Sequence, residues 1–381
     1  MTSDLRIALL GSRFMGDAHS NGWSQAGHFF DLPMQPTLAV AAARDAVHLE
    51  SFAARWGWER WTTDWTEAAT AIDVQLVDVG TPNHLHADQA VVALEAGKHV
   101  ACEKPLAGTL NDARAMRDAA SRSSGSTFVW FTYRRVPAVA LAHQLVAEGR
   151  LGRIYHIRAA YLQGWGGSQS PRTWRFQSEL AGSGAHGDLN AHIIDMAQFI
   201  SGEEIVEVSG ATEHRFIDER PLPDDPARMG PSTVDDAVAF LARFAGGAVA
   251  TFEATRLATG VKNSNRIEIH GERGALRFDF ERMNQLEYFD ADEPPRLHGW
   301  KTILATHGDH PYAGAWWPDG HWLGYEHTFA NQAADIIKAV GGLAPEVPLP
   351  DFADAYQTQR VMEAAIQSAR HHTPIAMSEI S

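Results

Sequence analysis

The sequence predicts an α/β chain in which an N-terminal doubly wound parallel sheet precedes an α+β region with a large, mainly antiparallel open sheet. Three observations support this class. Apolar strands alternate with amphipathic helices over the first third, and strand pairs joined by glycine turns follow from about residue 205. A length of 381 residues, 45% of them hydrophobic, also favours two domains over one. We expect the domains to span residues 1–131 and 132–381.

Five short apolar runs in the first third predict the strands of the parallel sheet. They read RIALLG (6–11), TLAVAAA (37–43), VQLVDVG (74–80), KHVAC (98–102) and STFVWF (126–131). Apolar residues at helical spacing lie between them, as at Leu49, Phe52, Ala53 and Trp56. Strands that are apolar throughout are buried on both faces, which is typical of a parallel sheet covered by helices on each side.

The rhythm of the sequence changes after about residue 132. A helix over residues 136–148 precedes a strand at 154–163 and a second helix that begins within 182–197. Two hairpins then turn at Gly246-Gly247 and near Gly271–Gly274. We expect residues 290–323 to form a long loop, and two helices to close the chain.

Composition excludes several classes of protein. The formal net charge is -15 and no basic cluster is present, which argues against a nucleic-acid partner. A single cysteine, Cys102, cannot form an internal disulfide and fits a reducing cytoplasm. The start of the sequence lacks a signal-peptide pattern, and no apolar run approaches the ~20 residues needed to cross a bilayer. We therefore expect a cytoplasmic protein without a membrane partner.

A glycine motif, GSRFMG, follows the first predicted strand and opens a helix. Gly11 and Gly16 match the first and third glycines of the G-x-G-x-x-G dinucleotide fingerprint, while Arg13 stands where the middle glycine belongs. The position between a strand and a helix favours a Rossmann dinucleotide site over a glycine turn without a ligand. The side chain of Arg13 must either point away from the pyrophosphate or pair with it.

Two further motifs end later strands of the same sheet. GTPNHLH (80–86) follows the third strand and CEKP (102–105) follows the fourth, at the edge where open α/β sheets bind their ligands. Lys104 is held by the following Pro105, although a lysine at a strand end is more often a solvated surface residue. His84 and His86 lack a nearby third ligand, so we expect no metal.

The stretch GSGAHGDLNAHIIDMA (182–197) combines flexible backbone with titratable side chains. Asp188 and His192 are four residues apart, which places them on one face of a helix near its start. The alternative is an ordinary capped helix with satisfied polar groups. Asp195 on the same face either orients the imidazole or is a simple helical neighbour, and we favour the latter. His186 precedes the pattern and is not expected to be catalytic.

These motifs together resemble the Gfo/Idh/MocA family of NAD(P)-dependent oxidoreductases. The likeness follows the family's order along nearly the whole chain, and its specific part is the lysine of EKP with the aspartate and histidine of D-x-x-x-H. The resemblance implies that Lys104 contacts the nicotinamide ribose and the substrate hydroxyl. It further implies that Asp188 hydrogen-bonds both the substrate and Lys104, and that His192 is the general base.

The resemblance also implies which residues bind each ligand. The cofactor contacts are Gly11, Phe14, Met15, Gly16, Arg44, Thr81, Pro82, Asn83, His86, Glu103 and Lys104. Segments of the second domain are similar to sugar dehydrogenases of the family and imply substrate contacts at Tyr133, Gln163, Trp165, Trp174, Arg175, Asp188 and His192. Thr132 departs from the asparagine of many relatives.

The second strand bears on the choice between NAD and NADP. Ala43 aligns with the acidic residue that usually accepts hydrogen bonds from the ribose hydroxyls of NAD, and Arg44 follows it. Arg44 can bind the 2′-phosphate of NADP or stack on adenine, while Asp45 is the acid if the strand ends later. We expect NAD(P) as the cofactor, leaning towards NADP.

The predicted reaction is reversible oxidation of a secondary hydroxyl on a sugar, anhydrosugar or cyclic polyol. The fold also hosts cofactor-dependent glycoside hydrolases and non-catalytic sensors of sugars or dinucleotides. Retention of Lys104, Asp188 and His192 argues against a sensor. The resemblance implies a homodimer or homotetramer that forms through the open face of the second sheet.

Overall fold

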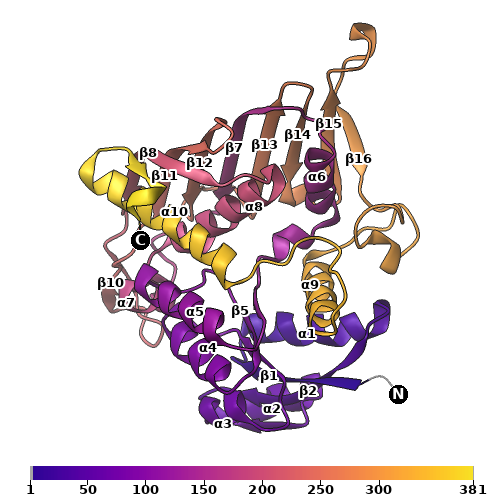
Figure 1. Ribbon diagram of the computed structural model, residues 1–381. Coiled ribbons are helices and arrows are strands. Elements are labelled where there is room, and N and C mark those ends of the chain that lie inside the picture. Colours follow the sequence, from indigo (N-terminus) through magenta and orange to yellow (C-terminus); the bar gives the residue numbers. More distant parts are fainter. Residues whose placement is uncertain (1–2, 381) are drawn as a thin grey trace. The chain divides into compact units, whose positions relative to one another are not determined.

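The computed structural model describes residues 3–380, which divide into two compact units (Figure 1). The first unit comprises the described residues up to Arg135 together with Gly314–Trp317 and Leu323–Tyr356. The second unit comprises Val136–Ala313, Pro318–Trp322 and the chain from Gln357 onward. Within residues 3–380, no helix is both long enough and apolar enough to span a membrane.

The first unit contains the expected parallel sheet. Its strands are β1 (Ser3–Leu10), β2 (Met34–Ala42), β3 (Arg60–Thr62), β4 (Leu76–Val79), β5 (His99–Cys102) and β6 (Thr127–Val129), in the order β3-β2-β1-β4-β5-β6. Every pairing is parallel, which confirms the doubly wound prediction. The three-residue β3 at the edge was not predicted, because Arg60 and Thr62 give it no apolar pattern.

Helices connect these strands. They are α1 (Phe14–Phe29), α2 (Ala46–Trp56), α3 (Trp65–Thr70), α4 (His86–Glu95) and α5 (Leu110–Arg122), with short 3₁₀ turns at Asn83–Leu85 and Thr132–Arg135. Helix α2 shows how local sequence sets the ends. The Asp45 side chain accepts a hydrogen bond from the His48 N–H at its start, and Gly57 adopts φ +78° at its end.

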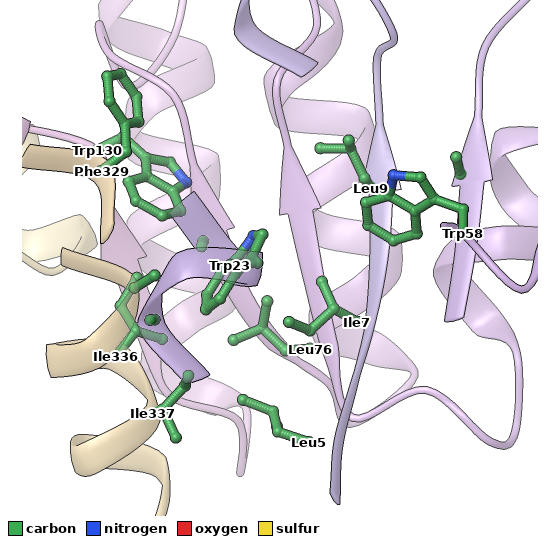
Figure 2. Packing of buried hydrophobic residues seen from close by; sticks show 14 of the residues in the cluster. Leu5, Ile7, Leu9, Trp23, Trp58, Leu76, Trp130, Phe329, Ile336 and Ile337 are labelled. Carbon is green, nitrogen blue, oxygen red and sulfur yellow. The ribbon is translucent and has the colours of Figure 1, made fainter. Parts of the chain in front are cut away.

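A helix from the far end of the chain completes the first unit. Helix α9 (Tyr325–Val340) lies against α1 and places Phe329, Ile336 and Ile337 in the same fully buried core as Trp23 (Figure 2). The two helices approach so closely that a Cβ on Gly22 would lie only 2.9 Å from the Cβ of Phe329. The compact units therefore do not follow the continuous segments 1–131 and 132–381.

A buried cluster of charged and polar side chains lies at the centre of the first unit. The carboxylate of Asp78 on β4 accepts hydrogen bonds from the indoles of Trp23 (2.7 Å) and Trp130 (2.8 Å) and from Nδ1 of His19 (2.9 Å). Nε2 of His19 lies 3.1 Å from Oε1 of Glu103. The imidazole thus bridges two carboxylates and links α1 to the ends of β4 and β5.

The second unit is built on a nine-stranded sheet with a separate two-stranded ribbon. Its strands are β7 (Ile154–Leu162), β8 (Ile205–His214), β11 (Ala237–Phe244), β12 (Val249–Thr255), β13 (Ser264–Gly271), β14 (Gly274–Asp279), β15 (Gln285–Asp290), β16 (Lys301–Leu304) and β17 (Ile375–Ala376). The order is β16-β15-β14-β13-β7-β12-β11-β8-β17, and only β7 and β12 pair in parallel. Strands β9 (Glu219–Pro221) and β10 (Met229–Pro231) form the ribbon.

Helices cover one face of this sheet. The helices of the second unit are α6 (Pro137–Ala147), α7 (Ser178–Ala181), α8 (Ala191–Ser201) and most of α10 (Phe352–His371), and short 3₁₀ turns lie at Trp174–Phe176, Phe280–Arg282, Pro295–Leu297, Ala313–Ala315 and Met377–Glu379. Helix α8 packs on β7 and β13, and α6 packs on β14 and β15 (Figure 1). Burial alternates along β12, so Phe252 faces the helices while Val249 and Glu253 face outward. This confirms a mainly antiparallel sheet with one open face.

The prediction of a long loop at 290–323 is only partly correct. Strand β16 lies within it and pairs antiparallel with β15, with Gln285 opposite Leu304. The four residues of β16 lie at a sheet edge and are mostly exposed, so they lack the apolar alternation that identifies a strand.

The His19 cluster predicts a specific dependence of stability on pH. Burial lowers the pKa of His19, but the charges and hydrogen bonds of Asp78 and Glu103 outweigh it and raise the pKa to about 9. Because the unfolded value is about 6.5, this stabilisation is fully present below pH 6.5 and is lost as the pH rises through 9. The contribution of His19 to the free energy of unfolding should fall by about 3 kcal/mol over this window.

Chemical unfolding of the wild type and of His19→Gln between pH 6 and pH 10 measures this contribution as the difference between the two curves. A difference that stays constant across the window would show that His19 is neutral in the folded protein.

Candidate active site

The glycine motif forms a tight turn between β1 and α1. Gly11 adopts φ +109°, and a Cβ there would lie 2.7 Å from the carbonyl oxygen of Gly80. A Cβ on Gly16 would lie 2.6 Å from the carbonyl oxygen of Gly11, so the helix passes directly over the turn. Both positions exclude side chains for the reasons that the dinucleotide fingerprint requires glycine.

The N-terminus of α1 fits a dinucleotide pyrophosphate. Arg13 at the N-cap provides no capping hydrogen bond, so its side chain does not occupy the first-turn N–H groups of α1. The Arg13 guanidinium pairs with the Asp45 carboxylate at 3.0 Å, and both side chains are exposed. Phe14 is 63% exposed beside this helix end, whereas Met15 packs against the core. Arg44 is exposed just beyond the end of β2.

Buried His86 ties together the loops that follow β4 and β5. Its Nε2 lies 2.8 Å from the carbonyl oxygen of Thr81, and its Nδ1 lies 3.2 Å from those of Pro105 and Leu106. Burial lowers the pKa of His86, which favours the neutral ring. His84 is exposed, so the two histidines that prompted the question of a metal point into different environments. Among residues 3–380 no group of three metal-ligating side chains is found.

The CEKP motif connects the buried cluster to Lys104. Glu103 directs Oε1 to His19, while its Oε2 accepts the backbone N–H of Lys104 at 3.2 Å. Lys104 itself is half-buried, and the peptide bond to Pro105 is cis. One carboxylate thus connects the buried His19 to the backbone of Lys104.

The other residues expected to contact the cofactor lie on the same loops. Thr81 donates its hydroxyl to Oε1 of Gln89 at 2.6 Å, Pro82 is half-buried, and Asn83 is buried at the start of a 3₁₀ turn. Tyr133 is also in the first unit, buried in the 3₁₀ turn after β6.

In the second unit, Asp188 lies in a π-helical turn rather than in a regular α-helix. The π turn covers His186–Asn190 and leads directly into α8, which carries His192. The predicted helix therefore begins with a π turn, which contains more residues per turn than an α-helix. Such turns are frequent at functional sites.

Side-chain hydrogen bonds from distant segments hold the π turn. The carboxylate of Asp235 accepts the backbone N–H groups of Gly184 (2.6 Å) and His186 (2.8 Å). The His186 ring lies between the carbonyl oxygen of Met362 and the Asn190 amide, both at 2.9 Å. His186 is thus engaged in holding the turn, and Asp195 lies buried one turn beyond His192.

The structure reveals an arginine beside Asp188 that the sequence did not single out. Nη2 of Arg256 lies 2.8 Å from Oδ2 of Asp188, and Nη1 donates to the carbonyl oxygen of Arg175 at 3.2 Å. Arg256 follows β12 and is buried. The 68 residues that separate it from Asp188 leave no local pattern that could have identified the pair.

Two of the expected substrate residues of the second unit, Gln163 and Trp165, lie just beyond the end of β7. Nε1 of Trp165 donates to Oε1 of Gln163 at 2.5 Å, and Nε2 of Gln163 donates to Oδ1 of Asn263 at 2.7 Å. The same Asn263 oxygen accepts the hydroxyl of Tyr161, whose ring centroid lies 5.7 Å from that of His192. The chain of hydrogen bonds thus runs from exposed Trp165 to the ring beside His192.

Trp174 and Arg175 form a second pair of the expected substrate residues in this unit. The Arg175 guanidinium lies over the Trp174 ring at 4.5 Å.

The expected residues therefore fall into two sets. The first unit holds the glycine turn, the loops after β4 and β5 with Lys104, and Tyr133. The second unit holds Gln163, Trp165, Trp174, Arg175, Asp188 and His192.

Comparison with known proteins identifies the family of the chain. Residues 5–131 match the model of an oxidoreductase family with an NAD-binding Rossmann fold, and residues 139–277 match the GFO/IDH/MocA C-terminal domain. The chain belongs to the Gfo/Idh/MocA family. As a member of this family it is an oxidoreductase with an NAD-binding domain.

Similar proteins of this family cover the whole chain. Levoglucosan dehydrogenase of Pseudarthrobacter phenanthrenivorans is 39% identical over 99% of both chains. The crystal structure of an oxidoreductase domain protein from Kribbella flavida is 50% identical, with a TM-score of 0.94 over 98% of this chain and 99% of that one. A levoglucosan dehydrogenase complex with NADH and levoglucosan is 40% identical, with a TM-score of 0.93 over 98% and 100%.

The glycine turn of this Gfo/Idh/MocA protein gives a direct test of the cofactor site. Gly11→Ala should destabilise the fold by more than about 1 kcal/mol and should weaken NADH binding, because the added methyl group collides with the Gly80 carbonyl. Gly149→Ala is the matched control, since Gly149 also has positive φ (+74°) but nothing lies within 4 Å of its Cβ. Chemical unfolding and NADH fluorescence titration of both variants measure the two effects. Equal losses in both variants would mean that backbone strain, and not the close approach, explains Gly11.

Proposed function

We propose that this protein catalyses reversible oxidation of a secondary hydroxyl on a sugar, anhydrosugar or cyclic polyol, with NAD(P) as the oxidant. The observation that carries the proposal is the full-length similarity to levoglucosan dehydrogenase combined with retention of Lys104, Asp188 and His192. Bound NAD(P) supplies the redox chemistry by accepting hydride from the carbon.

Each of the three residues has a separate role. His192 accepts the proton of the hydroxyl on its imidazole, which suits a base near neutral pH. The Lys104 ammonium stabilises the developing alkoxide charge, while the Glu103 carboxylate accepts the backbone N–H of Lys104. Asp188 accepts a hydrogen bond from the substrate and orients it.

The residues around Asp188 suit a neutral polyhydroxylated ligand. Trp165 is 43% exposed and offers an aromatic face, while Gln163 provides an amide beside it. Trp174, Arg175 and Tyr133 are proposed as further contacts. Indole and amide groups recognise hydroxyls and C–H faces without requiring a charge on the ligand.

For the cofactor, we propose a preference for NADP over NAD. Ala43 directly follows β2, so no carboxylate stands at the first position beyond the strand. The next carboxylate along the chain, that of Asp45, is paired with Arg13, and exposed Arg44 can bind a 2′-phosphate. The relatives solved with NADH show that the family fold also accepts the unphosphorylated cofactor.

We also propose that the protein forms a homodimer or homotetramer through the open face of the second sheet. Leu241 and Val249 expose apolar side chains on this face. Arg158, Arg266, Glu253 and Glu268 line the same face, so its charges have both signs. A surface with both signs can pair with a second copy of itself about a two-fold axis.

His192→Ala tests the assignment of the base. Turnover of levoglucosan should fall by about 10²–10⁴-fold while the affinity for NADH is retained. His186→Gln is the matched control, because His186 is engaged in structural hydrogen bonds and its loss should lower stability without changing the pH–rate profile. If His192→Ala retains wild-type turnover across pH, another group is the base.

Arg44→Ala tests the cofactor preference. Loss of one charged hydrogen bond of roughly 1.5–3 kcal/mol should weaken NADP by about ten- to 150-fold and NAD much less, as measured by titration of both reduced cofactors. Arg13→Ala is the control, since Arg13 is engaged by Asp45. A wild type that binds NAD more tightly, or equal losses for both cofactors in Arg44→Ala, would contradict the preference.

Leu241→Arg tests the proposed interface. A charge at this half-exposed apolar position should lower the mass measured by sedimentation from the oligomer to the monomer. Leu343→Arg changes a similarly exposed leucine of the first unit and should leave the mass unchanged. A wild type that sediments as a monomer rules out the interface.

A further inference from the structure

Arg256 occupies a position that connects several of the proposed substrate residues. Its guanidinium binds Oδ2 of Asp188 and the carbonyl oxygen of Arg175, as described above. Its own carbonyl oxygen accepts the N–H of Gly166 at 2.9 Å. A Cβ on Gly166 would lie 2.7 Å from the Cβ of Arg256, so the backbone next to Trp165 is fitted closely to this arginine.

Two aromatic rings lie beside the Arg256 guanidinium. It lies 5.2 Å from the centroid of Trp165 and 5.7 Å from that of Phe176, and these two rings lie 5.6 Å apart. Cation–π attraction at these distances stabilises the guanidinium beside the rings. The side chain of Arg256 is 3% exposed, whereas that of Asp188 is 24% exposed. The cation is therefore the buried member of the pair and the carboxylate is the accessible one.

The physical consequence concerns the charge of Asp188. A buried guanidinium needs a carboxylate partner, because an unpaired charge in this environment is strongly unfavourable. The pair keeps Asp188 ionised, so this residue accepts hydrogen bonds but does not take up a proton. The proton of the substrate must then go to a different group.

We infer that Arg256 is a positioning residue of the active site, which fixes Asp188 as an ionised acceptor and aligns Trp165 and Arg175 with it. The inference rests on the proposed function. One buried side chain would then set the positions of three groups: the Asp188 carboxylate, the Trp165 ring and the backbone carbonyl of Arg175.

Arg220 provides a matched control within the same unit. It is also fully buried, lies 3.7 Å from the centroid of Phe176 and pairs with the carboxylate of Asp236 at 3.0 Å. Its guanidinium donates hydrogen bonds to the carbonyl oxygens of Gly166 and Gly167, to the hydroxyl of Ser232 and to the carboxylate of Asp236. Loss of Arg220 should therefore lower stability in the same way as loss of Arg256, without the same effect on Asp188.

The experiment compares Arg256→Ala, Arg256→Lys and Arg220→Ala in the full-length protein with saturating cofactor. We expect Arg256→Ala to lower kcat/KM for levoglucosan by about 10²-fold at unchanged affinity for NADH, because a displaced acceptor misaligns the substrate. Millimolar guanidinium chloride, well below denaturing concentrations, should restore part of this loss by entering the space that the truncated side chain leaves beside Asp188. Arg256→Lys should recover only part, since an ammonium cannot reproduce the planar fork.

Double mutants with Asp188→Asn separate positioning from simple stability. In the Asp188→Asn background, Arg256→Ala should lower kcat/KM by less than about threefold, because the pair is already broken. Arg220→Ala should have the same effect on melting temperature and on kcat/KM in both backgrounds. If Arg256→Ala and Asp188→Asn are additive, or if guanidinium gives no recovery, Arg256 is structural only.

Calorimetric titration of levoglucosan into the same variants provides a readout that does not depend on turnover. If the wild type binds sugar but does not oxidise it, the proposed function fails. The sugar affinities of Arg256→Ala, Asp188→Asn and the double mutant then still decide the role of Arg256. A wild type that neither binds nor oxidises levoglucosan or myo-inositol with either cofactor overturns both proposals.

Discussion

The first unit depends on one carboxylate, that of Asp78, which is fully buried in the middle of a parallel sheet. A charge in this position is tolerated because two indole N–H groups and one imidazole surround it. These donors come from α1 and from the segment after β6, so the helix and both halves of the sheet must be in place before the charge is compensated. The imidazole also contacts the Glu103 carboxylate, which in turn accepts the backbone N–H of Lys104. The position of the proposed catalytic lysine is thus set by a polar core and not by its own contacts alone.

Much of this architecture could be predicted from the sequence. Continuous apolar strands between amphipathic helices indicate a parallel sheet, and glycine turns between alternating strands indicate hairpins, because both patterns arise from local geometry and one-sided burial. The requirement for glycine at positions 11 and 16 also follows from a local motif, because the turn at the end of β1 leaves no room for a side chain at Gly11 or Gly16. The family resemblance rested on four such motifs, and the matches to both family domains confirm it.

The features that could not be predicted all depend on contacts between distant segments. Arg256 ends an ordinary strand, and only the fold brings it to Asp188. The π turn at His186–Asn190 is held by Asp235 and Met362, neither of which is near it in sequence. Strand β16 exists because β15 offers it an edge, not because its four residues favour a strand. Which residues contact cofactor and substrate remains a prediction that the proposed variants address.

Helix α9 has a consequence for the order in which the protein can fold as it is synthesised. The core of the first unit includes Phe329, Ile336 and Ile337, yet more than half of the chain separates them from α1. When the ribosome has completed the six strands, the side of α1 that α9 covers, including Gly22, is still exposed to water. Most of the second unit must therefore be synthesised before the core of the first can be completed. Nascent chains of this protein therefore present an apolar surface for most of translation, which is the period in which a chaperone would be needed to shield it.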